Sequence, residues 1–317
     1  MVKTSFKQRI QKKGRHRILR HWELQVMVLP SIVFILIMSY IPMWGVLFAF
    51  QDYDIFAGFL HSPWVGLKHV RALLDAPVFW DIMRNTVVIS FLRLLILFPA
   101  PIILALMLNE IRKQSFKRVV QTITYLPHFL SWVIIGGFVA SFLAVDNGTL
   151  NITLMKLNLI QEPMNWLSIS NYFWTILIST NLWKEVGFGS IVYLAAIAGV
   201  DPHLYEAASV DGASRTKQIF LVTIPCISPV ISVFLILQLG RILDAGFEDI
   251  LVLTNNGINS IVNNVAEVID TYAYKIGLGD QRYSYGAAVG LFKSVINVFL
   301  LFAANGVARR LGRSSLF

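Results

Sequence analysis

Six long runs of apolar residues limit what this chain can fold into more than any other feature of its sequence. A run of about 20 apolar residues spans the hydrocarbon core of a bilayer. Hydrophobic residues fill 56% of the 317 positions and charged residues only 14%, whereas soluble domains carry about 25% charged residues. The sequence therefore predicts an all-α membrane protein with six transmembrane helices. They are expected at about Val26–Phe50, Thr86–Leu108, Ile123–Ala144, Tyr172–Gly199, Leu221–Leu243 and Tyr285–Val307.

The basic residues are distributed unevenly between the two sides of these helices. Eight precede the first apolar run, four lie in the second-to-third loop, two in the fourth-to-fifth loop and three in the C-terminal tail. These seventeen stand against six in the other three loops, and short loops rich in Lys and Arg stay in the cytoplasm. We therefore expect both termini in the cytoplasm. The net charge of +9 then reflects membrane topology, and no nucleic-acid partner is expected.

No internal repeat or low-complexity linker divides the chain. We predict a basic cytoplasmic segment over 1–25, a six-helix transmembrane domain over 26–308 and a cytoplasmic tail over 309–317. Cys226 is the only cysteine, so neither an intrachain disulfide nor a cysteine-rich metal site can form. Three long outer loops, 51–85, 145–171 and 244–284, complete the predicted organisation.

The loop between the fourth and fifth helices, residues 201–225, contains helical signals of its own. Asp201 can cap a short helix that has Pro202 in its first position. Gly212 then permits a turn that a residue with a Cβ would resist, and Ser214 can cap the next helix. These residues are compatible with an ordinary loop, and equally with a rigid contact for a soluble partner.

The same loop resembles the EAA loop of permeases in binding-protein-dependent ABC importers. In that family Glu-Ala-Ala is followed after three residues by Gly, and after nine more by Ile-x-Leu-Pro. This sequence has Glu-Ala-Ala at 206–208, Asp-Gly at 211–212 and Val-Thr-Ile-Pro at 222–225, so the spacing matches while Val replaces Ile and Ile replaces Leu. The resemblance implies that an ATPase subunit contacts Glu206, Ala207, Ala208, Asp211, Gly212 and Pro225.

The resemblance extends over nearly the whole chain. Within the family, the sequence is similar to the carbohydrate-uptake class, and in that class to permeases of oligo- and polysaccharide importers of the lipoprotein-transport and alginate-transport type. The stretches that carry it are Leu29–Phe50, Phe98–Glu110, Thr124–His128, Trp183–Glu185 and Gly290–Lys293. It implies a multi-pass protein of a prokaryotic plasma (inner) membrane, surrounded by lipid, that passes a carbohydrate inward. It also implies three protein partners: a second homologous permease, a dimer of ABC ATPases and an extracellular binding protein. The ATPase would bind ATP and Mg, so this chain is expected to be no enzyme and to hold no cofactor or metal.

Polar side chains inside the predicted helices are costly in a bilayer, so each requires a reason. We predict that six residues line a sugar path on the fourth and fifth helices: Trp183, Lys184, Glu185, Phe188, Gln238 and Arg241. Gly187 and Gly189 predict an irregularity in the fourth helix, and transporter sites often lie at such positions. Lys184 and Arg241 favour an acidic sugar such as an alginate oligomer. The structural alternative is ion pairing, between Arg241 and Asp244 or with a neighbouring subunit.

Two other classes of protein remain as alternatives. A secondary active sugar transporter would also have six or more helices, although the inverted repeats common in that class are not evident. An intramembrane enzyme has little support, because Gly-Leu-Gly-Asp at 277–280 lies in an outer loop without a second aspartate in a span. The chain has neither a P-loop nor a His-Glu-x-x-His motif.

Overall fold

The computed structural model describes residues 22–255, 257 and 259–310. Within those residues the chain is helical, and the only extended pairing is an isolated antiparallel bridge between Gln51 and Trp64. The predicted N-terminal segment, 1–25, and the predicted tail, 309–317, lie largely outside the described residues. The longer helices are α2 (Trp22–Ile35), α5 (Phe79–Ile96), α6 (Pro99–Glu110), α7 (Gln114–Tyr125), α8 (Trp132–Phe142), α10 (Ser170–Ala198), α13 (Ile224–Leu239) and α17 (Tyr283–Arg310).

Shorter helices form the connections between these elements. On one side lie α11 (Pro202–Val210) and α12 (Arg215–Gln218), the latter joined to α13 by the π-helical η5 (Ile219–Thr223). The remaining short helices are α3 (Gly58–His61), α4 (Lys68–Leu74), α9 (Thr149–Lys156), α14 (Glu248–Leu253), α15 (Asn263–Ala266) and α16 (Ile269–Tyr274). The π-helical segments besides η5 are η1 (Leu36–Tyr40) and η7 (Lys275–Gly279), and the 3-10 segments are the ten-residue η2 (Ile41–Phe50) and the short turns η3 (Leu126–Phe129), η4 (Trp166–Ser168) and η6 (Ser260–Val262).

Among the described residues, four stretches are long and apolar enough to cross a membrane as they stand: Leu24–Phe50, Phe79–Glu110, Arg215–Leu239 and Tyr283–Arg310. Each contains or closely overlaps one predicted helix. Two further candidates are bent pairs, and the count reaches six when each pair is taken as one span. The predicted all-helical membrane fold is therefore confirmed.

The helix predicted over 123–144 is interrupted, which the sequence analysis did not anticipate. Gln114–Phe129 and Trp132–Phe142 meet at an angle of 103°. Pro127 lies in the 3-10 turn η3, where a proline prevents continuation of the α-helical hydrogen bonds. Ser131 then adopts an extended conformation and its hydroxyl accepts a hydrogen bond from the N–H of Ile134 at 3.3 Å, so a new helix begins there. The other bent pair, Ser170–Ala198 with Pro202–Val210, turns by 71° where the loop 201–225 was expected to begin.

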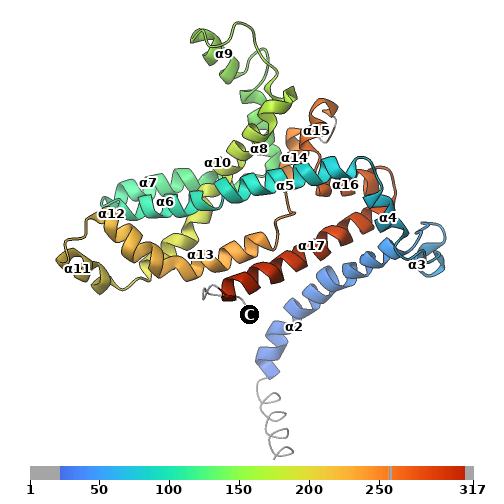
Figure 1. Ribbon diagram of the computed structural model, residues 1–317, viewed down its shortest axis with the longest axis horizontal. Coiled ribbons are helices and arrows are strands. Elements are labelled where there is room, and N and C mark those ends of the chain that lie inside the picture. The colour runs from blue at the N-terminus through green and yellow to red at the C-terminus, as the bar shows by residue number, and fades with distance from the viewer. Residues whose placement is uncertain (1–21, 256, 258, 311–317) are drawn as a thin grey trace, which may run out of the picture.

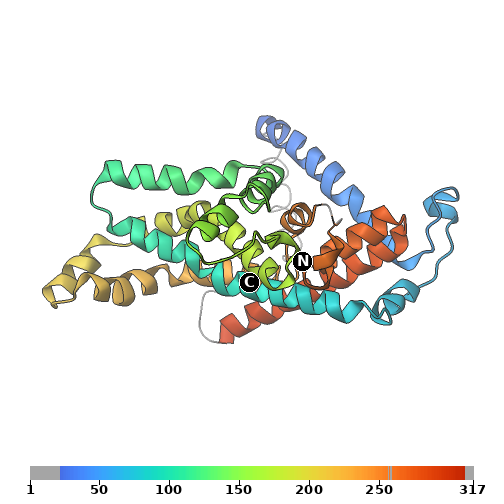
Figure 2. The ribbon, with the colours of Figure 1, turned by 90° about the horizontal axis from the view of Figure 1, so that it is seen from above.

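The long helices separate two groups of short helices, which lie at opposite ends of the molecule (Figure 1). Helices α11 and α12 lie at one end of α5, α6, α13 and α17, and helices α3 and α4 lie at the other. Helix α10 packs against α6, while α17 packs against η2 and α4. Helix α2 runs away from the rest of the chain in both views (Figures 1 and 2), and its described apolar side chains are exposed.

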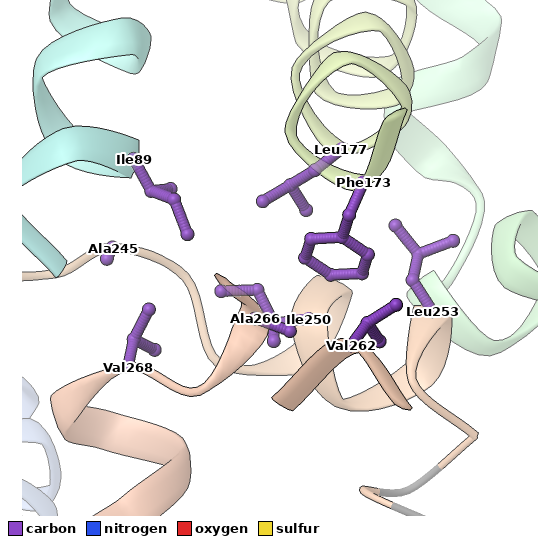
Figure 3. Packing of buried hydrophobic residues seen from close by; sticks show 9 residues of the cluster. All are labelled: Ile89, Phe173, Leu177, Ala245, Ile250, Leu253, Val262, Ala266 and Val268. Atoms are coloured by element: carbon purple, nitrogen blue, oxygen red, sulfur yellow. The ribbon is translucent and has the colours of Figure 1, made fainter. Parts of the chain in front are cut away.

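The main buried core forms where the outer segment 244–284 folds back between two long helices (Figure 3). Ile89 of α5 and Phe173 and Leu177 of α10 point toward side chains of this segment. The remaining members of the cluster are Ala245, Ile250, Leu253, Val262, Ala266 and Val268. This outer segment is thus a folded part of the structure, with α14, α15 and α16 inside it.

Candidate functional site

The loop 201–225 has the helix, turn and helix that its sequence predicts. The Asp201 carboxylate accepts a hydrogen bond from the N–H of His203 at 3.0 Å, and Pro202 occupies the first turn of α11. Gly212 follows the helix with a φ of +77°, in the region that favours glycine. Ser214 stands at the N-terminus of α12, but its side chain makes no capping hydrogen bond, so that prediction is wrong.

Helix α11 is anchored to the membrane helices by side-chain hydrogen bonds. The hydroxyl groups of Tyr205 and Thr223 lie 3.0 Å apart, joining α11 to η5. Gln218 donates from its amide to the Ser209 hydroxyl at 2.9 Å and to the Ala213 carbonyl at 3.1 Å. These contacts close the turn around Gly212 and hold α11 in one orientation relative to the helix that enters the membrane.

The opposite face of α11 is uncovered. Glu206, Ala207, Asp211 and Gly212 are exposed, and Ala208 is half-buried. Val210, on the same helix, is 87% exposed. Small and apolar side chains that flank one carboxylate can pack closely against a second protein. Pro225 is exposed in the first turn of α13, two residues beyond the anchor Thr223.

Lys184 occupies the inside of the break between η3 and α8. Its residue exposure is 5%, and its ammonium group donates to the carbonyls of His128 at 2.7 Å and Leu130 at 3.1 Å. The Glu185 carboxylate lies 3.5 Å away and the Trp132 ring centroid 5.4 Å away. Lys184 therefore supplies hydrogen-bond donors to carbonyls at the point where the helix is interrupted. It reaches these groups from α10, more than 50 residues along the chain.

The neighbouring predicted path residues form a partly exposed surface on α10. Glu185 accepts a hydrogen bond from Nδ1 of His128 at 2.8 Å. The Phe188 ring stacks on the His128 ring with centroids 3.8 Å apart and an interplanar angle of 2°. The Trp183 ring lies nearly parallel to Phe138 at 6.0 Å and is 46% exposed. This surface combines aromatic faces with one carboxylate, the groups that bind sugar rings and sugar hydroxyls.

The irregularity predicted at Gly187 and Gly189 is wrong, because α10 is continuous from Ser170 to Ala198. The glycines serve close packing instead. A Cβ at Gly187 would lie 2.0 Å from the carbonyl oxygen of Thr124 in α7, and one at Gly189 would lie 3.0 Å from Pro101 in α6. Glycine allows these backbones to approach each other.

Gln238 and Arg241 lie on a different wall, at the end of α13. Together with Ser90, Arg93 and Asp244 they line a cavity of about 10 Å³. The Ser90 hydroxyl and Nε of Arg93 are buried there without a hydrogen-bond partner among the described residues. Gln238 and Arg241 make no hydrogen bond, ion pair or ring contact with the α10 group within the described chain.

The predicted pairing of Arg241 with Asp244 is not present, because Lys293 occupies the aspartate. The Lys293 ammonium lies 2.5 Å from a carboxylate oxygen of Asp244 and 2.5 Å from one of Asp270. Asn297, one turn further along α17, donates to Asp244 at 3.4 Å and accepts from the N–H of Leu243 at 3.2 Å. Arg241 is exposed, and no carboxylate among the described residues pairs with its guanidinium.

A buried ion pair that the sequence analysis missed joins α5 to the outer segment. Arg93 donates to the Asp249 carboxylate, which also accepts a hydrogen bond from the Asn181 amide at 2.8 Å. The two charged side chains are 14% and 4% exposed. Asp249 lies in the short apolar helix α14, and a carboxylate within such a run was the signal available in the sequence. A Cβ at Gly246, which has a φ of +101°, would lie 2.3 Å from the Arg93 guanidinium.

Comparison with known proteins identifies the family of the chain. Residues 98–313, more than half of the chain and including the whole loop 201–225, match the family described as binding-protein-dependent transport system inner membrane component. The chain belongs to this family. It is therefore a permease subunit of an ABC importer and a multi-pass protein of the inner membrane.

Individual relatives of the permease are similar over nearly its full length. Protein LplB of Bacillus subtilis is 42% identical over 93% of this chain and 91% of its own length. The polygalacturonan/rhamnogalacturonan transport system permease protein YteP of the same organism is 42% identical over 98% and 95%. A chain in the crystal structure of a bacterial ABC transporter involved in the import of the acidic polysaccharide alginate superposes with a TM-score of 0.85. That chain is 41% identical, with 95% of this permease and 100% of the other chain covered.

Family membership decides between the alternatives left open by the sequence. A permease of this kind works with a binding protein and with other subunits of the transporter, one of which hydrolyses ATP. The secondary transporter and the intramembrane enzyme are therefore excluded, and ATP binds to the ATPase subunit rather than to this chain.

Proposed function

We propose that this permease forms part of the route by which an acidic oligo- or polysaccharide crosses the membrane inward. The observation that carries the proposal is the likeness, at 41% identity over 95% of the chain, to a subunit of an alginate importer. Alginate is described there as acidic, and the polygalacturonan named for YteP is likewise a polymer of acidic sugars. A charged backbone is thus common to the cargo of two similar proteins.

The proposed assembly contains a second homologous permease and a dimer of ABC ATPases. We assign the ATPase contact to Glu206, Ala207, Ala208, Asp211 and Gly212, with Pro225 fixing the start of the membrane helix. Support comes from the uncovered face of α11 and from the hydrogen bonds of Tyr205 and Gln218 on its other side. A helix held rigidly on one face and bare on the other can transmit a displacement of the ATPase to α13.

Arg241 and Gln238 are proposed to bind the passing sugar. Arg241 has no carboxylate partner in the described chain, and the cavity beside it contains the unpartnered Ser90 hydroxyl and Arg93 Nε. A cation in a passage of low dielectric constant acts on an anion far more strongly than one at a surface. The cavity has room for about one water-sized group, so passage of a sugar requires the segment 240–246 to move.

The residues of α10 divide into two roles in this proposal. Trp183, Phe188 and Glu185 are partly exposed and are proposed to contact sugar rings and hydroxyls. Lys184 is proposed to act as a positioning residue, because its buried ammonium already binds two carbonyls at the helix break. The predicted path then has one positively charged residue facing the cargo, Arg241, rather than two.

The test compares Arg241→Gln with Arg241→Lys in the assembled transporter. Uptake of uronic-acid and neutral oligosaccharides into proteoliposomes is measured beside the yield of intact complex. We expect Gln to lower acidic uptake about tenfold or more, because a charged hydrogen bond is lost, and Lys to retain most of it. Equal uptake of acidic sugar by both variants and the parent would refute the assignment, and loss of the complex would make Arg241 structural.

A further inference from the structure

A second cavity is lined by residues of α4 and of the start of α17. These elements lie at the end of the molecule opposite α11 (Figure 1). Its volume is about 530 Å³, within the range of about 300–1,000 Å³ typical of small-molecule sites. Three chain segments line it: Asp52–Asp54 after the first span, Gln281–Tyr285 at the start of α17, and, in α4, Lys68, His69 and Ala72. None of these residues belongs to the predicted sugar path or to the coupling loop.

The walls of this outer cavity are held in place by contacts between distant parts of the chain. The Ser284 hydroxyl accepts a hydrogen bond from the N–H of Tyr53 at 2.8 Å, across 231 residues of sequence. The Asp52 carboxylate binds Lys68 at 2.5 Å and His69 at 2.8 Å. The Tyr53 ring stacks on Phe48 with centroids 4.2 Å apart. These contacts fix the three wall segments relative to one another.

Two tyrosine rings make an aromatic corner in the cavity. Tyr53 and Tyr283 are half-buried, with centroids 6.1 Å apart and an interplanar angle of 80°. Phe48 stacks on one face of the Tyr53 ring, so the remaining ring surfaces of the two tyrosines are those that can meet an occupant of the cavity they line. The apolar face of a sugar ring packs on aromatic side chains, while its hydroxyl groups need donors and acceptors nearby. Asp54 and Gln281, both exposed at the rim, provide them.

One cation at the cavity is left for a ligand. The Lys68 ammonium is committed to Asp52, whereas the Arg282 guanidinium lies 4.7 Å from the Tyr285 ring centroid. No carboxylate among the described residues pairs with Arg282, which is exposed. Gln281 beside it has a φ of +57°, an uncommon value for a residue other than glycine. Arg282 lines the cavity immediately before Tyr283, the first residue of α17.

We propose that the outer cavity binds a short stretch of an acidic saccharide, with Tyr53 and Tyr283 packing on a sugar ring and Arg282 binding its carboxylate. The inference rests on the proposed function for the nature of the cargo, but concerns a separate site. A lipid phosphate fits less well, because only one cation is free and two aromatic rings share the cavity. A metal ion fits less well too, since the Asp52 carboxylate is already neutralised by Lys68.

The experiment uses the complete transporter in nanodiscs without its binding protein. Binding of a fluorescently labelled oligogalacturonate is measured by anisotropy for the parent, Arg282→Gln, Tyr283→Ala and Tyr283→Phe. We expect about tenfold weaker binding for Arg282→Gln and several-fold weaker binding for Tyr283→Ala. Tyr283→Phe should bind within about twofold of the parent, because it keeps the ring. Arg71→Gln is the matched control, since it removes an exposed charge from α4 outside the cavity.

Separate readouts distinguish failure of this site from failure of the proposed function. Uptake of acidic oligosaccharide into proteoliposomes tests the function, and anisotropy tests the cavity. Undetectable binding to the parent at millimolar sugar, or equal binding by all variants, would overturn the inference even where uptake proceeds. If Arg282→Gln weakens docking of the sugar-free binding protein while leaving oligogalacturonate binding unchanged, the cavity is a protein contact and the inference is wrong.

Discussion

Replacing Gly187 with alanine tests the packing between α10 and α7 most directly. The added Cβ would lie 2.0 Å from the Thr124 carbonyl oxygen and 2.4 Å from its carbonyl carbon, whereas ordinary contacts begin at 3.4 Å. The obstacle is main chain, which cannot rotate away, so α7 must move by about 1.4 Å. Overpacking costs about 1–3 kcal/mol or more, and a clash of 2.0 Å with main chain belongs at the upper end of that range, above the ~1 kcal/mol that alanine gains over glycine in a helix.

The free energy of unfolding is expected to fall by about 2 kcal/mol in Gly187→Ala, which is about 3 kcal/mol of overpacking less the ~1 kcal/mol of helix propensity that alanine gains. It corresponds to a fall in Tm of about 4–8 °C on the scale known for domains of 150–250 residues. Thermal unfolding of the purified transporter, followed by tryptophan fluorescence, measures it. Gly137→Ala is the control, because a Cβ at that exposed position of α8 has no atom within 4 Å. An unchanged or higher Tm for Gly187→Ala would refute the reasoning.

Three further predictions concern the coupling turn, the buried ion pair and the first outer loop. Gly212→Val should abolish substrate-stimulated ATP hydrolysis in an intact complex, because valine resists the positive φ of this position. Gly212→Asn should keep most of the hydrolysis, because asparagine tolerates a positive φ. Equal loss of hydrolysis in the two variants would contradict this role of the turn. Asp249→Leu leaves Arg93 buried without a partner, at a cost of about 3–5 kcal/mol, so gel filtration should show little assembled complex. The hydrogen bond from Lys68 lowers the pKa of Asp52. The ionised carboxylate therefore stabilises the folded loop fully at pH values above its ordinary pKa of 3.8. This stabilisation is lost as the pH falls through the lowered pKa of the folded protein. Hydrogen exchange over 52–69 should therefore increase only in strong acid, and Lys68→Met should move that transition to higher pH; an identical transition in both proteins would argue against the pair.

The parts of this structure that sequence could predict are those with local signals. The apolar runs place the spans because length and hydropathy alone decide whether a helix crosses a bilayer. The helix and turn around Gly212 follow from Asp201, Pro202 and Gly212 themselves, whose conformational preferences act within a few residues.

The rest depended on contacts between residues far apart in the chain. The partners of Lys184 are main-chain carbonyls at a break near Pro127, and carbonyls leave no mark in a sequence. Gly187 was read as an irregularity because a glycine that permits close packing and one that bends a helix look alike from sequence. The alternative in which Asp244 pairs with Arg241 considered a residue three positions away, whereas the fold brings Lys293 to Asp244 from α17.

The Arg93–Asp249 pair has a consequence for how the protein is made. The two residues are 156 positions apart, so the arginine enters the membrane well before its partner has been synthesised. At about 5–20 residues per second, ribosomes need roughly 8–30 s to reach the aspartate. During that interval the second span must stay inserted although it carries an unpaired charge, which costs about 2.5–3.5 kcal/mol on insertion scales. The leucines and isoleucines around Arg93 offset that cost, and the span depends on them until translation supplies Asp249.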